Sequence, residues 1–97
     1  MLKKYKEKKE NFNQMLKATQ IVANEYKQKS YDFWASNPED EIRFDRTIDG
    51  IELSFVIDWA EQKDGGLFVD IIARGNLPTN FGAQPREYFV VYKQNAL

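Results

Sequence analysis

Asp49-Gly50 stands between two stretches of alternating apolar and polar residues, and no other feature of the chain restricts its fold as strongly. A dipeptide of this kind between such stretches is typical of a two-residue β-hairpin turn. The turn sets the cross-strand pairs, which are Ile48 with Ile51, Arg46 with Leu53, Phe44 with Phe55, and Ile42 with Ile57. One face then collects nearly all the apolar side chains, and a one-residue slip would scatter them. Turn chemistry and hydrophobic pattern therefore predict the same antiparallel hairpin.

A second hairpin is expected to follow, with its turn in residues 61–66. The glycines of Asp64-Gly65-Gly66 adopt positive φ easily, and residues 67–74 alternate again. The predicted pairs are Trp59 with Leu67, Ile57 with Val69, Phe55 with Ile71, and Leu53 with Ala73, with Glu52 opposite Arg74 on the other face. The stretch from Ile42 to Arg74 thus predicts a three-strand antiparallel meander with a continuous apolar face.

The region before the meander has a helical pattern. Residues 2–35 contain neither Gly nor Pro, and their apolar residues recur every three or four positions. Pro38 ends the pattern, because proline disfavours helical dihedral angles at the residue before it. We expect a helix over residues 11–36, with residues 1–10 as a basic overhang or a frayed start. A continuous helix would measure about 50 Å against about 30 Å for a nine-residue strand, so a break near Ser30 is the alternative.

The rest of the chain completes one α+β fold. Residues 75–85 hold two Gly and two Pro and predict a long loop, and residues 86–93 predict a fourth strand. We expect a single domain over residues 1–97, since the chain is too short for two cores. It consists of one long N-terminal helix packed on a four-stranded antiparallel meander, with strands at 42–48, 51–59, 67–74 and 86–93. This arrangement resembles the cystatin and nuclear-transport-factor-like architectures, which implies a possible pocket between the helix and a curled sheet.

The composition removes several classes of function. The chain has no Cys and no His, which excludes disulfides, histidine–metal sites and Ser-His or Cys-His catalysis. The cluster Glu39-Asp40-Glu41 lacks the alternating oxygen ligands and central Gly of a calcium loop. Gly65-Gly66 precedes a strand, whereas a phosphate loop precedes a helix. Asp58 and Asp70 are expected diagonally placed on neighbouring strands, where carboxylates are usually solvated. We therefore expect no enzymatic activity, no metal and no cofactor.

Charge divides the chain into a basic and an acidic part. Residues 1–30 carry eight Lys and three Glu, a net charge of +5, and residues 31–97 carry a net charge of −6. The first residues could contact nucleic-acid phosphates, through Lys3, Lys4, Lys6, Lys8 and Lys9. The sequence pI of about 5.4 and the intervening Glu7 and Glu10 argue against nucleic acid as a partner. No stretch approaches the ~20 apolar residues of a membrane span, so we expect a cytoplasmic protein with no membrane contact.

The face of the sheet turned away from the helix is expected to be only half polar. An antiparallel sheet covered on one side normally alternates apolar inward and polar outward. In the last strand, either the set with Tyr88 and Tyr92 or the set with Phe89 and Val91 must stay outside the core. The candidate interface residues are Val56, Phe68, Ile72, Phe81, Tyr88 and Tyr92.

These residues favour a non-enzymatic protein–protein interaction or regulatory module, such as a small inhibitor, an immunity-type protein or an adaptor. Large apolar and aromatic groups dominate the energetics of such interfaces. The partner is expected to be another protein or a second copy of the chain. Two alternatives remain open: a small-ligand-binding domain with a pocket under the helix, and a nucleic-acid-associated protein using the lysines of its start. A curled sheet that covers its own outer face would remove the need for a partner.

Overall fold

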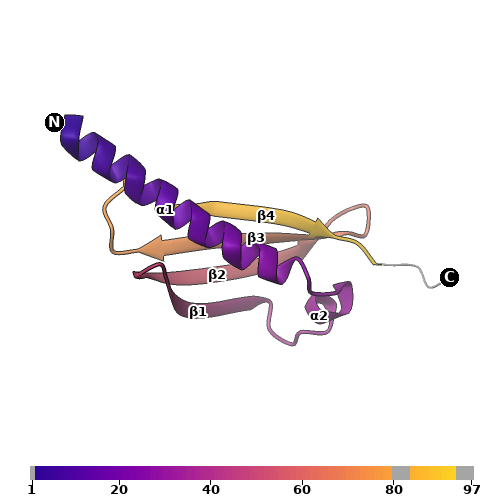
Figure 1. Cartoon of the computed structure of the whole chain (residues 1–97). Helices are drawn as coiled ribbons and strands as arrows, with labels where there is room; N and C mark the ends of the chain where they lie inside the picture. The colour runs from indigo at the N-terminus through magenta and orange to yellow at the C-terminus, as the bar shows by residue number, and fades with distance from the viewer. Residues whose placement is uncertain (1, 80–83, 94–97) are drawn as a thin grey trace.

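The computed structural model describes residues 2–79 and 84–93, without the side chains of residues 2–5. Two helices and four strands follow in the order α1 (Leu2–Tyr26), α2 (Tyr31–Ala35), β1 (Glu41–Ile48), β2 (Ile51–Glu61), β3 (Leu67–Gly75) and β4 (Arg86–Val91). The strands pair antiparallel in the order β1-β2-β3-β4, and α1 crosses one face of the sheet (Figure 1). The predicted α+β fold, a long N-terminal helix on a four-stranded meander, is confirmed.

The helix predicted over residues 11–36 is divided in two. α1 ends at Tyr26, and Ser30 has extended dihedral angles, φ −73° and ψ 164°. The Ser30 hydroxyl accepts a hydrogen bond from the backbone N–H of Phe33 at 3.3 Å, so Ser30 is the N-cap of α2. The break near Ser30, which the sequence allowed as an alternative, is thus the arrangement found. It turns Trp34 of α2 into the core, where 1% of this residue is exposed.

The start of α1 extends beyond the sheet (Figure 1). Lys6, Glu7, Lys9 and Glu10 are exposed. The side-chain amide of Asn11 donates a hydrogen bond of 2.8 Å to the carbonyl of Pro78 in the loop after β3. From this point on, α1 lies against the rest of the molecule, with Met15 buried beside the sheet.

The first hairpin has the predicted register. All four predicted pairs are present, from Ile48 opposite Ile51 to Ile42 opposite Ile57. Asp49 and Gly50 both have positive φ, 52° and 78°. These values are those of a type I′ turn, whose twist matches that of the flanking strands.

The predicted register of the second hairpin is wrong by two residues. Glu61 lies opposite Leu67, and Trp59 pairs with Val69 in place of Leu67. The turn is shorter than expected, because the N–H of Gln62 donates to the carbonyl of Gly66 at 2.8 Å and extends the pairing. A shift of two residues keeps every side chain on its predicted face, since side chains in a strand alternate with period two.

The corrected register changes the pairs on the outer face. Arg74 lies opposite Ser54, so the predicted pair with Glu52 is wrong. Asp58 and Asp70 lie directly opposite each other, whereas the predicted register placed them diagonally. β2 also continues two residues beyond its predicted end at Trp59, and β4 ends at Val91, two residues before the predicted end of the fourth strand.

The core lies between the two helices and one face of the sheet. Trp34 packs edge-to-face against Trp59, with ring centroids 5.0 Å apart, and against Phe89 at 6.2 Å. The buried apolar residues of the sheet are Ile48, Leu53, Phe55, Ile57, Leu67, Val69, Ile71 and Ala73. In β4, Phe89 and Val91 pack against this core, so Tyr88 and Val90 face outward.

Candidate functional site

The outer face of the sheet is the side turned away from the core. Within the described residues, α1 and α2 both lie on the opposite side, where their buried residues join the core (Figure 1). The middle of the outer face consists of Val56, Asp58 and Ala60 of β2, Phe68, Asp70 and Ile72 of β3, and Arg86, Tyr88 and Val90 of β4. Most of these side chains are apolar, although no described element covers them.

Two aromatic rings stack on this face. Phe68 of β3 and Tyr88 of β4 have ring centroids 5.5 Å apart and an interplanar angle of 27°. Tyr88 is 65% exposed, and Val90, which lies directly opposite Phe68, is 37% exposed. Nearby, Val56 and Ile72 lie opposite each other and are half-buried. The outer face therefore presents an apolar and aromatic band across three strands.

Tyr92 lies just after β4 and is held by the turn between β2 and β3. Its hydroxyl donates to Oδ2 of Asp64 at 3.0 Å, and Oδ1 of Asp64 accepts from the N–H of Gly66 at 3.0 Å. These two hydrogen bonds hold the pKa of Asp64 below its usual range, and the bond to Asp64 raises the pKa of Tyr92. A Cβ atom at Gly66 would lie 2.8 Å from Cε1 of Tyr92, so the ring needs a glycine beneath it.

A pair of carboxylates lies within the apolar band. Asp70 is only 16% exposed in its side chain, and Nε of Arg86 lies 3.2 Å from its Oδ1 in an ion pair that is not aligned as a hydrogen bond. Burial raises the pKa of Asp70, Arg86 opposes this shift, and the charge of Asp58 adds to it. Two carboxylates against one guanidinium leave the middle of the band with a net negative charge.

The structure places five of the six predicted interface residues on or beside this face, namely Val56, Phe68, Ile72, Tyr88 and Tyr92. Phe81 lies outside the described residues. Sequence reasoning placed Asp58 and Asp70 on neighbouring strands as a diagonal pair, but it did not name Val90 as a candidate and did not join Arg86 to the two carboxylates. The register of β2 with β3 places Asp58 opposite Asp70, and the register of β3 with β4 brings Arg86 to Asp70.

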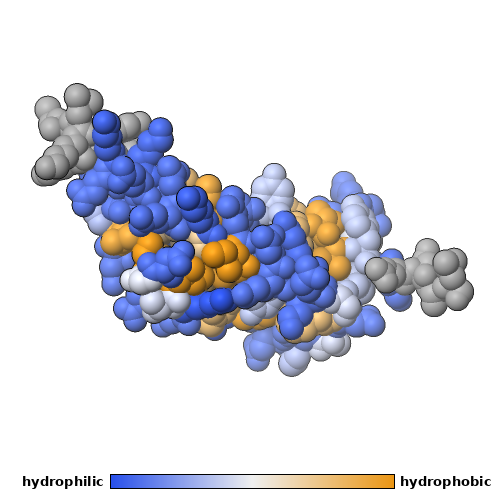
Figure 2. Space-filling view, in the orientation of Figure 1, coloured by the Kyte–Doolittle hydropathy of each residue, from blue (hydrophilic) through white to orange (hydrophobic). Residues whose placement is uncertain are grey.

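The predicted nucleic-acid lysines belong to the start of α1. Lys6 and Lys9 are exposed and Lys8 is partly exposed, whereas the side chains of Lys3 and Lys4 lie outside the described part. Figure 2 shows the described start of α1 as a mainly hydrophilic surface. These lysines belong to the overhang, away from the middle of the sheet (Figure 1).

The space between the helices and the sheet is occupied by side chains, chiefly those around Trp34. A hollow of about 420 Å³ lies at the margin, between α2 and the end of β2, where Tyr31, Trp34 and Trp59 line it together with Glu39, Asp40 and Glu61. The lining of this hollow thus combines aromatic rings with exposed carboxylates at the edge of the core.

Within residues 2–79 and 84–93, no helix is long and apolar enough to span a bilayer. In the same part of the chain, no three acidic side chains come together as a metal-binding group would require. Comparison of the chain with protein-family models, with curated proteins and with solved structures finds no match. The geometry of the outer face therefore provides the basis for a functional proposal.

Proposed function

We propose that this protein is a non-enzymatic protein–protein interaction or regulatory module of the cytoplasm, of the small inhibitor, immunity-type or adaptor kind. It binds its partner through the outer face of the sheet. The observation that supports this proposal best is the stacked pair of Phe68 and Tyr88 beside Val90, on a face that no described element covers.

The outer face has the composition of an interface centre. Aromatic side chains add large apolar area at a low cost in conformational entropy, and they are enriched among residues that carry most of the binding energy. An aromatic pair contributes about 0.5–1.5 kcal/mol beyond the area that it buries. Charged residues that surround the band, such as Arg43 and Glu41 of β1, fit the polar rim of such an interface.

The carboxylates of the band indicate the chemistry of the partner. Arg86 forms an ion pair with Asp70, whereas Asp58, directly opposite Asp70, forms no ion pair among the described residues. A partner that covered them with apolar groups alone would leave a buried uncompensated charge, which is strongly unfavourable. We therefore expect the partner to place an Arg or Lys side chain opposite Asp58. A second copy of the chain has Arg43 and Arg74 on its own outer face and so meets this requirement.

The alternative functions have less support from the geometry. Aromatic side chains fill the space in which a ligand under the helix would lie. The lysines of the α1 overhang are separate from the aromatic rings of the outer face, whereas single-stranded nucleic acid is usually bound by both together. These observations favour the outer face over the ligand-binding and nucleic-acid alternatives.

The proposal can be tested by replacing Tyr88 with a photo-crosslinking phenylalanine derivative. Irradiation in cells of the source organism should join the protein to a defined partner or to a second copy, and the same group at Lys17 of α1 is the control. The joined partner is then purified, and its affinity is measured with Phe68→Ala and with unaltered protein. We expect at least about tenfold weaker binding for Phe68→Ala. A strictly monomeric protein whose crosslinks are the same from both positions would contradict the proposal.

A further inference from the structure

β4 has a free backbone edge. It is the last strand of the sheet, and within the described residues it pairs only with β3. The N–H of Ala73 donates to the carbonyl of Pro85 at 3.0 Å, so this pair is a hydrogen-bonded one. In an antiparallel ladder, hydrogen-bonded and non-hydrogen-bonded pairs alternate. The backbone groups of Phe89 therefore point toward β3, and the N–H and C=O groups of Tyr88 and Val90 point outward from the sheet.

The two edges of the sheet differ in character. Proteins usually protect edge strands against pairing with other chains, and charged side chains are a common means. β1 carries charges at Glu41, Arg43, Asp45 and Arg46. In β4 the charged residues are confined to the start, Arg86 and Glu87, and the segment from Tyr88 to Tyr92 carries no charged residue and no Pro. Of the two edges of the described sheet, the one at β4 is thus the less protected against another strand.

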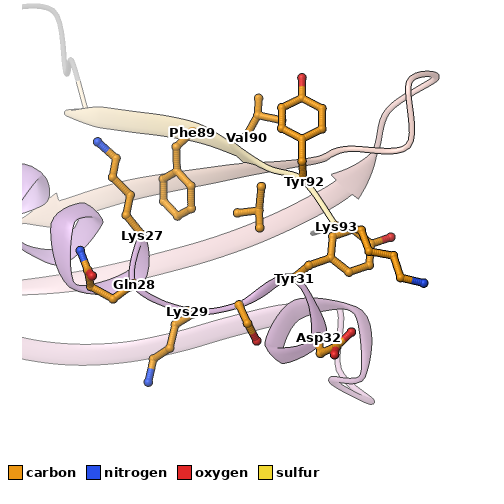
Figure 3. A pocket seen from close by; sticks show the side chains of 11 residues that line it. Lys27, Gln28, Lys29, Tyr31, Asp32, Phe89, Val90, Tyr92 and Lys93 are labelled. Carbon is orange, nitrogen blue, oxygen red and sulfur yellow. The ribbon is translucent and has the colours of Figure 1, made fainter. Parts of the chain in front are cut away.

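A groove follows the same edge. It has a volume of about 850 Å³ and lies between the end of β4 and the linker at residues 27–30 (Figure 3). Five successive residues line one wall, Phe89 to Lys93, and six successive residues line the other, Lys27 to Asp32. Side chains of successive strand residues point to opposite faces. A wall made of successive residues therefore includes the backbone of the strand as well as the face that bears Phe89 and Val91.

The charge of the groove selects among possible strands. Lys27, Lys29 and Lys93 line it, and Asp32 is its one acidic residue. The ammonium group of Lys27 lies 5.9 Å from the ring centroid of Phe89, so it is positioned over an apolar surface (Figure 3). Phe89 and Val91 are half-buried and provide the apolar part of the groove. An extended segment with alternating acidic and apolar side chains matches this surface.

We propose that β4 accepts an extended acidic segment of a partner protein as a fifth strand. The backbone of the segment pairs with Tyr88 and Val90, and its carboxylates meet Lys27 and Lys93. Main-chain hydrogen bonds provide affinity in this mode of recognition, and alternate side chains provide specificity. The site is distinct from the aromatic band of the outer face, because it uses the backbone of β4 and the lysines of the groove.

The probe is a fluorescein-labelled peptide of seven residues that alternates Glu and Val, with blocked ends. Fluorescence anisotropy should show saturable binding that weakens as salt is added, because the contact is partly electrostatic. A peptide that alternates Lys and Val should bind at least about tenfold more weakly. A Glu-Val peptide with alternate amides N-methylated should lose binding. Three outcomes would overturn the proposal: equal binding of the Glu-Val and Lys-Val peptides, no binding of the Glu-Val peptide, or no effect of N-methylation.

The groove is tested with Lys27→Glu combined with Lys93→Glu. The matched control is Lys17→Glu combined with Lys63→Glu, which makes the same change of charge at exposed positions outside the groove. We expect at least about tenfold loss of peptide affinity for the first variant alone, with equal melting temperatures for both. Equal affinities of the two variants would overturn the proposal.

Hydrogen exchange identifies the edge directly. In the free protein, the amides of Tyr88 and Val90 should exchange much faster than those of Phe89 and Val91, which bond to β3. The Glu-Val peptide should slow exchange at Tyr88 and Val90 selectively, and unchanged exchange at these two amides would contradict strand addition. Phe68→Ala should leave peptide binding unaltered. If Phe68→Ala removes it instead, the peptide occupies the outer face and the edge proposal fails while the proposed function stands.

Discussion

Among single residues, Asp70 is the group whose environment most clearly opposes its charge. Its folded-state pKa is raised, chiefly by burial, so the folded protein binds a proton there more readily than the unfolded chain does. Protonation of Asp70 therefore stabilises the folded protein. This contribution to the free energy of unfolding is complete below the ordinary pKa of an Asp carboxyl, and it is lost as pH rises through the raised folded pKa. At neutral pH, the charged form of Asp70 destabilises the fold.

Asp70→Asn should consequently raise the free energy of unfolding near pH 7, by on the order of 0.5 kcal/mol. The gain should vanish near pH 3, where the carboxyl is protonated in both states. Urea unfolding at the two pH values measures both quantities, and Glu52→Gln on the same face is the control. A loss of stability at pH 7 would show that the ion pair with Arg86 outweighs burial and the repulsion from Asp58.

The hydrogen bond between Tyr92 and Asp64 predicts a shift in a phenol titration. The carboxylate raises the pKa of Tyr92, since removing the hydroxyl proton would place two negative charges side by side. Asp64→Asn should therefore lower the pKa of Tyr92 toward the ordinary value for tyrosine. NMR spectra of ring-labelled tyrosine over a pH titration measure it, and the other tyrosines serve as internal controls. A pKa of Tyr92 that does not move would mean that the bond does not persist in solution.

The residue-level register could be predicted for one hairpin and not for the other. Asp49-Gly50 determines a two-residue turn and hence a unique pairing, which the structure confirms. Residues 62–66 allow several turn lengths, and registers that differ by two residues give the same two faces. The hydrophobic pattern therefore could not distinguish them. The hydrogen bond from Gln62 to Gly66 decides between them, and nothing in the apolar spacing indicates it.

On the scale of elements, the short helix α2 places one large residue at the centre of the core. Trp34 contacts Tyr26, Trp59 and Phe89, but its indole N–H has no acceptor among the described residues. Trp34→Ala should lower the free energy of unfolding by about 3–5 kcal/mol. Trp34→Phe should lower it much less, because it keeps an aromatic ring and removes an unsatisfied donor. Urea unfolding followed by circular dichroism measures both, and equal losses would contradict this account.

The break before α2 could not be located from helical propensity. Residues 2–35 contain no Gly or Pro, so every local preference favours a continuous helix. Ser30 ends this continuity because it caps a new helix, and the new direction buries Trp34 against Trp59. A tertiary contact thus overrides the local preference. The difference between helix length and strand length indicated that the helix must either break or extend beyond the sheet. It did not distinguish between these two arrangements, and the structure has both.

At the level of the whole molecule, the overhang of α1 predicts tolerance to truncation. Lys6, Glu7, Lys9 and Glu10 are exposed, whereas Met15 is 2% exposed in the core. Deletion of residues 2–8 should change the free energy of unfolding by less than about 0.5 kcal/mol. Deletion of residues 2–16 removes Met15 and should abolish cooperative unfolding. Thermal denaturation distinguishes the two variants. A large loss from the shorter deletion would show that the overhang contacts the fold.

The candidate surfaces differ in how far the sequence predicted them. The aromatic positions of the outer face follow from alternation alone, so most of them could be named in advance. The groove could not be found in this way. Lys27 and Lys93 lie far apart in the sequence, and only the position of the linker beside the last strand brings them to one groove. Alternation assigns a side chain to a face, but it does not assign neighbours across the fold.

The unequal edges of the sheet also limit how copies of this molecule can assemble. Growth of a filament by strand addition requires two receptive edges on every unit, since each unit must bind one neighbour on either side. Here β1 carries charges at four of its eight positions, whereas those of β4 are confined to Arg86 and Glu87, so β4 is the more receptive edge. If two molecules joined through β4, neither would have a further receptive edge. Edge pairing between copies would therefore stop at a closed pair, because the charges of β1 disfavour the addition of a further strand there.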